Sequence, residues 1–137
     1  MKNLILCISV FSLFFSCNKS ESVQPTVADL ILGEWTLSSF VMICDDESQN
    51  VALTRSDENG CVEFLEDEKC LNLEFFADGT AKGTDITGTL IYTTNEESKT
   101  LNLCFDGTDC VIFTLKGDQL SFDEDEDDCV CTFGFEK

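Results

Sequence analysis

From residue 30 onward, apolar and polar residues alternate along short runs of the chain. Apolar side chains occupy every second position over 71–75, 101–105, 111–115 and 129–135, which is the period of a strand with one buried face. Turn-forming residues separate these runs, and no window of comparable length shows the period of a helix. The pattern therefore predicts an all-β domain.

Local features add detail to this prediction. The alternation shifts register at Ser38-Ser39, which predicts a bulge or a bend. The threonine-rich segment 84–94 has the composition of a strand, and Asp78-Gly79 favours the positive φ of a hairpin turn. The run of acidic residues over 123–128 lies between two apolar runs, so we expect a solvated hairpin loop there.

The expected strands are short and recur about every ten residues, which is typical of a sandwich or a barrel. Sequential hairpins favour an antiparallel up-and-down β-barrel of about eight strands, because closure leaves no exposed sheet edge. A barrel that spans a membrane would show the same alternation, but these runs are short for that purpose.

The first residues have the layout of a signal peptide. Lys2 precedes an apolar stretch over 4–15, and a small residue, Ser16, stands directly before Cys17. The alternatives are an ordinary secretory signal, which would carry an A-x-A-like site, and an uncleaved anchor, which would need about 20 apolar residues. The segment resembles the lipobox of Gram-negative lipoproteins, and this resemblance implies that Cys17 is the lipidation site and the first mature residue.

The chain is thereby divided into a lipoprotein signal peptide over 1–16, a lipidated N-terminus and flexible tether over 17–29, and a barrel domain over 30–137. Polar residues and the single proline, Pro25, are typical of a tether. The protein is expected to associate with the membrane through N-terminal acyl chains such as palmitate, because several acyl chains together anchor a protein firmly. By similarity to known sorting rules, Asn18 after the cysteine favours the outer membrane of the cell envelope.

Charge and composition exclude several functions. Removal of Lys2 with the signal peptide leaves 27 acidic and 7 basic residues, a net charge of −20. Such a surface repels phosphates, so no nucleic acid is expected as a partner. The chain has no histidine, and Arg55 is its only arginine, so the usual bases, histidine-bound zinc and the arginine clamp of phosphoryl transfer are missing. We expect no catalytic residue, no metal site, no cofactor and hence no enzyme.

Cysteines are unusually frequent. Cys7 lies in the signal peptide and Cys17 is the expected lipidation site. The barrel domain holds the remaining seven, namely Cys44, Cys61, Cys70, Cys104, Cys110, Cys129 and Cys131. In an exported protein these are disulfide candidates, and an odd number leaves one thiol that is either buried or reactive. Zinc is the competing interpretation, but paired C-x₂-C motifs are absent from the sequence.

Strand geometry limits how these cysteines pair. Cys129 and Cys131 on one strand point to the same face, farther apart than the Cβ–Cβ distance of roughly 3.5–4.5 Å that a disulfide needs. They are therefore expected to bond different partners, or one stays free. Cys104 and Cys110 flank residues 105–109, which are expected to form a hairpin loop: an odd loop length sets the two cysteines opposite each other, and an even one puts them on opposite faces.

Short motifs resemble those of a known family. Leu32-Gly33-Glu34-Trp35, at the first predicted strand, resembles the Gly-x-Trp opening of lipocalins. The segments 75–80 (FFADGT) and 115–120 (LKGDQL) are similar to later motifs of small bacterial lipocalin-like lipoproteins. The resemblance implies an antiparallel barrel in which Gly33 and Trp35 close one end. In animal lipocalins a late arginine stacks on this tryptophan, and this chain has no arginine near its C-terminus.

The Phe, Leu and Ile side chains on the inward faces of such a barrel favour a site that binds a small apolar ligand. Inward apolar side chains either form such a cup or simply fill the interior, and a barrel of about eight strands permits both. A filled barrel would instead act as a surface interaction or accessory module, whose protein partner is unknown. No ligand-binding residue is identified, although Tyr92 and Arg55 are unusual candidates. The acidic run 123–128 raises calcium binding as a weaker alternative, but it lacks an Asp-x-Asp-x-Asp-Gly loop.

Overall fold

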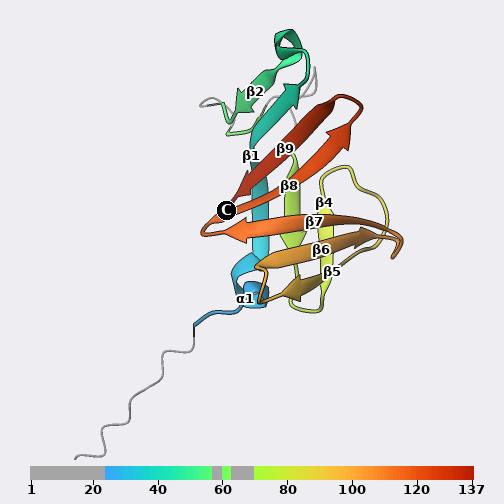
Figure 1. Ribbon diagram of the computed structural model, residues 1–137. Helices are drawn as coiled ribbons and strands as arrows, with labels where there is room; N and C mark the ends of the chain where they lie inside the picture. The colour runs from blue at the N-terminus through green and yellow to red at the C-terminus, as the bar shows by residue number, and fades with distance from the viewer. Residues whose placement is uncertain (1–23, 57–59, 63–69) are drawn as a thin grey trace, which may run out of the picture.

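The computed structural model describes residues 24–56, 60–62 and 70–137. The predicted signal peptide and Cys17 lie outside these residues. Within them, the alternating runs form antiparallel strands (Figure 1). The strands are β1 Gly33–Cys44, β2 Val51–Thr54, β3 Asn72–Phe75, β4 Thr80–Gly83, β5 Leu90–Asn95, β6 Thr100–Phe105, β7 Asp109–Lys116, β8 Gln119–Glu126 and β9 Cys129–Glu136. The helices are α1 Val27–Ile31 and a 3₁₀ turn, η1 Glu47–Gln49.

The first strand, β1, closes the sheet on itself. Residues 36–44 of β1 pair with β9, and residues 33–36 pair with β3 on the opposite edge. From β3 to β9 each strand pairs with the next one in the chain. The result is a closed eight-stranded antiparallel barrel with one extra strand, β2, which confirms the predicted all-β up-and-down architecture.

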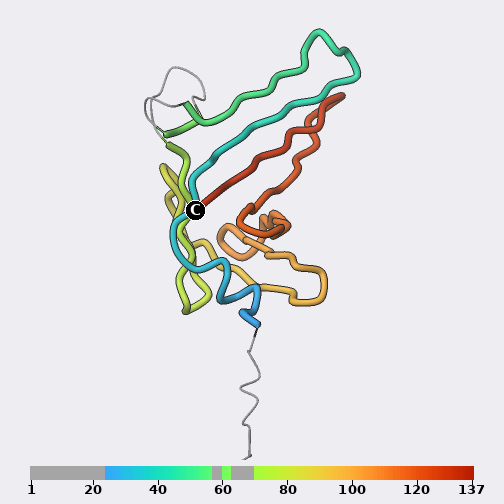
Figure 2. The backbone as a smooth tube through the Cα atoms, turned by 90° about the vertical axis from the view of Figure 1, so that its left-hand side faces the viewer, coloured from blue at the N-terminus to red at the C-terminus, as the bar shows by residue number. Residues whose placement is uncertain are grey.

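The extra strand lies on the same edge of β1 as β3 does. β2 pairs with residues 39–42 of β1, and the amide of Arg55 then donates to the carbonyl of Ser38 at 2.9 Å. The amide of Leu37 donates to the carbonyl of Leu71 at 2.8 Å, directly before β3 begins. β2 and β3 therefore serve as two parts of one strand that are separated in the sequence by residues 56–70 (Figure 2).

A bulge lies where the sequence predicts one. The register between β1 and β9 shifts between Leu37 and Ser39, and the Ser38 hydroxyl donates to the carbonyl of Gly134 at 3.1 Å. A side chain at Gly134 would collide with the Ser39 hydroxyl as it is placed, so the glycine on the facing strand leaves room for this hydroxyl at the bulge.

The strand predicted over 84–94 is shorter than expected. β4 ends at Gly83 and β5 begins only at Leu90. Between them the backbone turns through positive φ values of 58° at Asp85 and 133° at Gly88. Because an extended strand requires negative φ, the first residues of this segment form a connection between β4 and β5, and only its later part is a strand.

The acidic run is mostly strand, which corrects the predicted loop. β8 continues through Glu126, and only Asp127 and Asp128 form the turn into β9. Along this stretch β8 pairs with β9, whereas its ladder with β7 ends at Ser121. β8 therefore has an open side beyond that point, and exposed carboxylates on such a strand discourage pairing with other chains. This protection explains why a strand tolerates so many acids.

The short helix α1 packs against one end of the barrel. Its residues Val27 and Ile31 are fully buried, and a capping box formed by Thr26 and Asp29 satisfies its first turn. Residues 27–29, which the sequence predicts as the end of the tether, therefore form part of this helix. The reason is that a capped turn with two apolar residues can bury them on the barrel.

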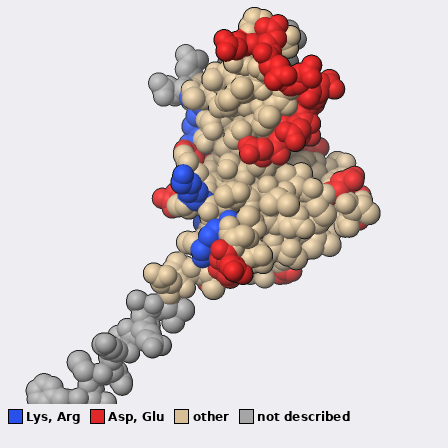
Figure 3. Space-filling view, in the orientation of Figure 1, with Lys and Arg blue, Asp and Glu red and all other residues tan. Residues whose placement is uncertain are grey.

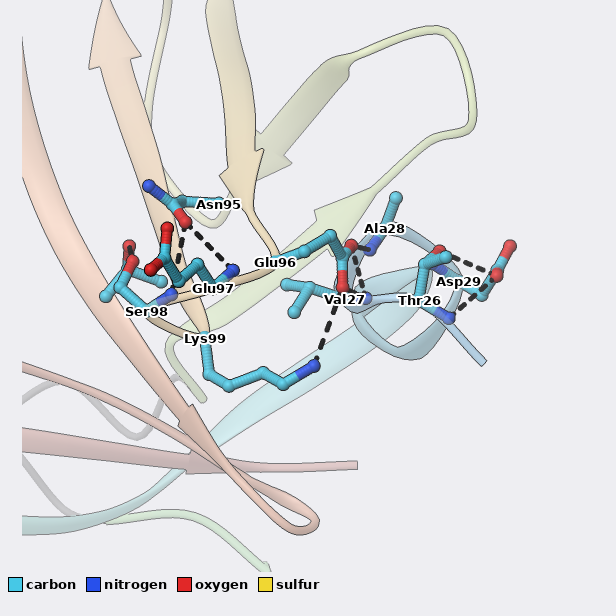
Figure 4. Close-up of polar contacts among 10 residues, drawn as sticks. Thr26, Val27, Ala28, Asp29, Asn95, Glu96, Glu97, Ser98 and Lys99 are labelled. Atoms are coloured by element: carbon cyan, nitrogen blue, oxygen red, sulfur yellow. Dashed lines mark hydrogen bonds and ion pairs between the residues drawn. The ribbon is translucent and has the colours of Figure 1, made fainter. Parts of the chain in front are cut away.

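A carboxylate from the β5–β6 turn fixes this helix to the barrel. Both oxygens of Glu96 accept from the amide of Val27, at 2.7 and 2.9 Å, and Lys99 lies 3.6 Å from the same carboxylate (Figure 4). The negative charge beside the first turn also interacts favourably with the positive, N-terminal end of the helix dipole. These contacts join two segments that are far apart in the sequence.

The two ends of the barrel differ in charge. α1 lies at one end, and η1 and the β8–β9 turn lie at the other (Figure 1). At this second end the amide of Asp45 donates to the carbonyl of Asp128 at 3.0 Å, and acidic side chains gather on the visible face (Figure 3). Neither α1 nor any other helix in the described part of the chain has the length and apolar character needed to cross a bilayer.

Candidate functional site

An apolar cavity of about 220 Å³ lies inside the barrel. Strands β3, β5, β6, β7, β8 and β9 all contribute to its wall. The most deeply buried of its lining residues are Leu73, Leu90, Leu103, Phe113 and Phe135. All except Leu90 occupy positions that the alternating pattern assigns to the inward face. The sequence therefore predicted which side chains point inward, but not that they leave space between them.

The cavity borders the place where two strands separate. β7 and β8 pair next to the turn that joins them, over 114–116 and 119–121, and they diverge with distance from this turn (Figure 1). The rings of Phe113 on β7 and Phe122 on β8 lie 4.7 Å apart and fill part of the gap. Phe122 in turn stacks on Phe133 at 4.6 Å. This aromatic cluster forms one wall of the cavity and leaves the remaining space open.

The mouth of the cavity is lined by partly exposed side chains. Ile86 and Val111 are 40% and 39% exposed, and Phe105 is half-buried between them and the interior. At Gly88 an added Cβ would lie 2.8 Å from the Phe105 ring. Gly88 therefore permits both its own positive φ and the position of this ring.

One lining residue is charged. Asp109 begins β7 and shares the inward face with Val111, and its side chain is exposed at the mouth. Its pairing partner across the β6–β7 hairpin is Phe105. The remaining lining residues are hydrocarbon side chains, which can exclude water and hold an apolar molecule but cannot transfer a proton or attack a substrate.

Neither of the unusual candidates from the sequence, Tyr92 and Arg55, lines the cavity. The Tyr92 ring is buried edge-on against Phe75, at 5.3 Å between centroids, and its hydroxyl donates to the carbonyl of Phe76 at 2.5 Å. Burial, and secondarily the charge of Asp78, raises the pKa of this phenol. Arg55 is exposed beside β1. Tyr92 is thus a core residue with a satisfied hydroxyl.

The closed end of the barrel is built around Trp35. Its ring is buried, and its indole nitrogen donates to the carbonyl of Ile31 at 2.7 Å. Gly33 precedes it with a φ of 101°, which lets the chain turn from α1 directly into β1. The two residues that the resemblance singles out therefore lie together where the helix meets the barrel.

A lysine takes the position over this tryptophan. The ammonium nitrogen of Lys137 lies 5.1 Å from the centre of the Trp35 ring and donates to the carbonyl of Leu30 at 2.6 Å. The chain has no arginine near its C-terminus, and the cation over Trp35 is this lysine. The sequence did not indicate this contact, because a lysine at the end of a strand carries no signal of the residue that it touches.

Six of the seven candidate cysteines form disulfides. The pairs are Cys44–Cys129, Cys61–Cys70 and Cys104–Cys110. The first and third join residues that stand directly opposite each other in the ladder. Five residues separate the third pair, so the odd loop length applies. The prediction that disulfides use most of these cysteines is confirmed.

The remaining thiol, Cys131, is buried on the inner face of β9. Burial, followed by the charges of Glu126 and Glu124, raises the pKa of this thiol. A protonated, buried sulfur is a poor nucleophile. Of the two outcomes left open by the sequence, the structure therefore favours a structural cysteine over a reactive one.

The acidic strand does not gather ligands for a metal ion. Because side chains alternate along β8, Asp123 and Asp125 point to one face, and Glu124 and Glu126 point to the other. Within residues 24–56, 60–62 and 70–137, no group of three or more acidic or cysteine side chains could hold a metal ion. Calcium needs six to eight converging oxygens, and the strand geometry separates the carboxylates of this run.

Comparison with protein-family models, with curated proteins and with solved structures found no match for this chain. The class is therefore defined by the fold alone. A closed eight-stranded antiparallel barrel with an apolar interior is compatible with a lipocalin-like, or calycin, fold.

Proposed function

We propose that this chain is a lipid-anchored, lipocalin-like envelope protein whose barrel binds a small apolar ligand. The observation that carries the proposal is the cavity of about 220 Å³ with its wall of Leu, Ile, Val and Phe side chains. An ordinary protein interior is packed without voids of this size. An apolar space that water occupies poorly is suited to a hydrophobic molecule.

Tethering is the second element of the proposal. It rests on the resemblance of residues 1–17 to a lipoprotein signal and not on the described structure. Replacement of Cys17 by Ala should release the protein from the membrane fraction of its host. Continued membrane association of Cys17→Ala would contradict an anchor at this residue, and a mature N-terminus at Met1 would contradict cleavage.

The ligand site is tested by a pair of substitutions on adjacent residues of β7. Val111 lines the mouth, whereas Ile112 points outward and is 65% exposed. Val111→Phe should fill the mouth, and Ile112→Phe adds a ring to the outer face of the same strand. Binding of a neutral probe, 1-naphthylmethanol, is measured by calorimetry to the mature chain, residues 17–137, carrying Cys17→Ala.

We expect Val111→Phe to weaken probe binding at least tenfold and Ile112→Phe to leave it unchanged. Equal affinities for the two variants would place the probe outside the cavity. Absence of binding to the parent chain would leave the filled barrel, an interaction or accessory module at the membrane, as the better description.

A further inference from the structure

We propose that the preferred ligand is a small apolar molecule that carries a positive charge at one end, and that the cavity discriminates against apolar carboxylates. This inference rests on the proposed ligand-binding function and adds the class of ligand to it. Its basis is the position of Asp109, the charged side chain at the mouth of an otherwise apolar cavity.

The size of the cavity limits the apolar part of the ligand. A cavity of about 150 Å³ lined by apolar residues holds benzene. The space of about 220 Å³ inside this barrel therefore accommodates one ring or two fused rings. A long acyl chain exceeds this volume, so the fatty-acid type of ligand is disfavoured by size before charge is considered.

The charges at the mouth favour a cation. Asp109 is on the inward face of β7, opposite Phe105 on β6. The carboxylate of Asp106 lies close by, where it accepts from the amide of Thr89 at 3.3 Å and lies 3.4 Å from a Cβ built at Gly88. No lysine or arginine is among the lining residues. A ligand carboxylate would therefore meet the Asp109 carboxylate at the mouth without a compensating base among the lining residues.

The whole protein acts in the same direction. A net charge of −20 on the predicted mature chain attracts cations toward the surface and repels anions. This field does not depend on any single residue, whereas the local charge at the mouth depends on Asp109. An ammonium group that projects from the cavity would lie beside this carboxylate at the protein surface, where charge interactions are stronger than in bulk water.

Three probes with the same rings test the inference: 1-naphthylmethylamine, 1-naphthylmethanol and 1-naphthoate. Their dissociation constants are measured by calorimetry with the same mature chain carrying Cys17→Ala, in its parent form and with Asp109→Asn. The matched control is Asp118→Asn, which removes an exposed carboxylate from the β7–β8 turn, away from the lining residues.

We expect the amine to bind most tightly and the carboxylate most weakly. Asp109→Asn should reduce the ratio of their affinities about tenfold and leave the alcohol unchanged, because one partly exposed charge contributes a severalfold effect to each charged probe. Asp118→Asn should leave the ratio close to that of the parent.

The failures are distinguishable. If the alcohol binds but the amine and carboxylate bind equally well, or if both aspartate variants change the ratio alike, the charge preference is overturned and the apolar site stands. If none of the three probes binds the parent chain, the ligand-binding function is overturned and this inference with it.

Discussion

The ammonium group of Lys137 lies 5.1 Å from the centre of the Trp35 ring and joins the end of β9 to the start of β1. The same nitrogen donates to the carbonyl of Leu30, which lies in the last turn of α1. One side chain therefore connects the helix, the first strand and the last strand at the closed end of the barrel.

Removal of this charge should destabilise the barrel. Lys137→Met keeps the length of the side chain but loses the cation–π contact and the hydrogen bond, so we expect a loss of about 1 kcal/mol in the free energy of unfolding. Lys137→Arg should retain most of it. Urea unfolding followed by the fluorescence of Trp35, the single tryptophan, measures the change. Lys116→Met is the control, and an equal effect there would show that Lys137 contributes only general charge.

The barrel could be predicted from the sequence because the alternation that indicates it is a local property of each strand. A period of two places Leu101, Leu103 and Phe113 on the inward face wherever their strands pair, and the shift at Ser38-Ser39 marks the bulge directly. The division of one strand into β2 and β3 could not be predicted, since it depends on which residues of β1 each segment pairs with. The position of Lys137 depends on a non-local contact in the same way.

The cavity lay beyond prediction for a different reason. Whether Leu73, Leu103 and Phe113 touch one another or surround a space depends on where β7 and β8 separate. Alternation along a strand contains no information on that separation. The sequence could therefore supply the chemical character of the interior and the charge of Asp109, but not the space between them.

Substitution of Gly88 tests whether its contact with Phe105 stabilises the mouth of the cavity. Gly88→Ala should lower the free energy of unfolding by about 1–3 kcal/mol, because its φ of 133° is unfavourable for alanine and the new Cβ would displace the Phe105 ring. Gly107→Ala is the matched control: its φ is 78°, and a Cβ there meets no atom within 4 Å. Thermal unfolding of both variants should show a larger loss at Gly88. Equal losses would mean that the contact with Phe105 is unimportant.

Tyr92 provides a test of burial through its titration. Burial raises the pKa of its phenol above the ordinary value of 10.0, and it is the single tyrosine of the chain. The tyrosinate absorbance of the folded protein should therefore appear at a higher pH than in urea. A midpoint equal to that of the unfolded chain would contradict the buried position.

The same shift fixes the sign of a stability change with pH. Because the folded state holds this proton more tightly than the unfolded state, the Tyr92 contribution is constant below pH 10.0 and is lost as the pH rises through the folded pKa. Tyr92→Phe should therefore lose stability less steeply than the parent above that pH. The comparison of the two slopes removes the shared effect of the lysines, and identical slopes would contradict the raised pKa.

The disulfides should differ in value according to the loops that they close. Cys44–Cys129 spans 85 residues and closes β1 onto β9, whereas Cys104–Cys110 spans 6 residues within one hairpin. On the loop-entropy account, replacement of both cysteines by serine should cost about 4.6 kcal/mol for the long loop and about 2.2 kcal/mol for the short one.

Urea unfolding of the two double variants under oxidising conditions measures this difference. Since Cys131 is a free thiol, each double variant should also carry Cys131→Ala, which prevents thiol–disulfide exchange with the remaining bridges during unfolding. The parent for comparison is Cys131→Ala alone. If the hairpin pair costs as much as the pair that joins β1 to β9, the native ladder and not the closure of the chain determines what these bridges contribute.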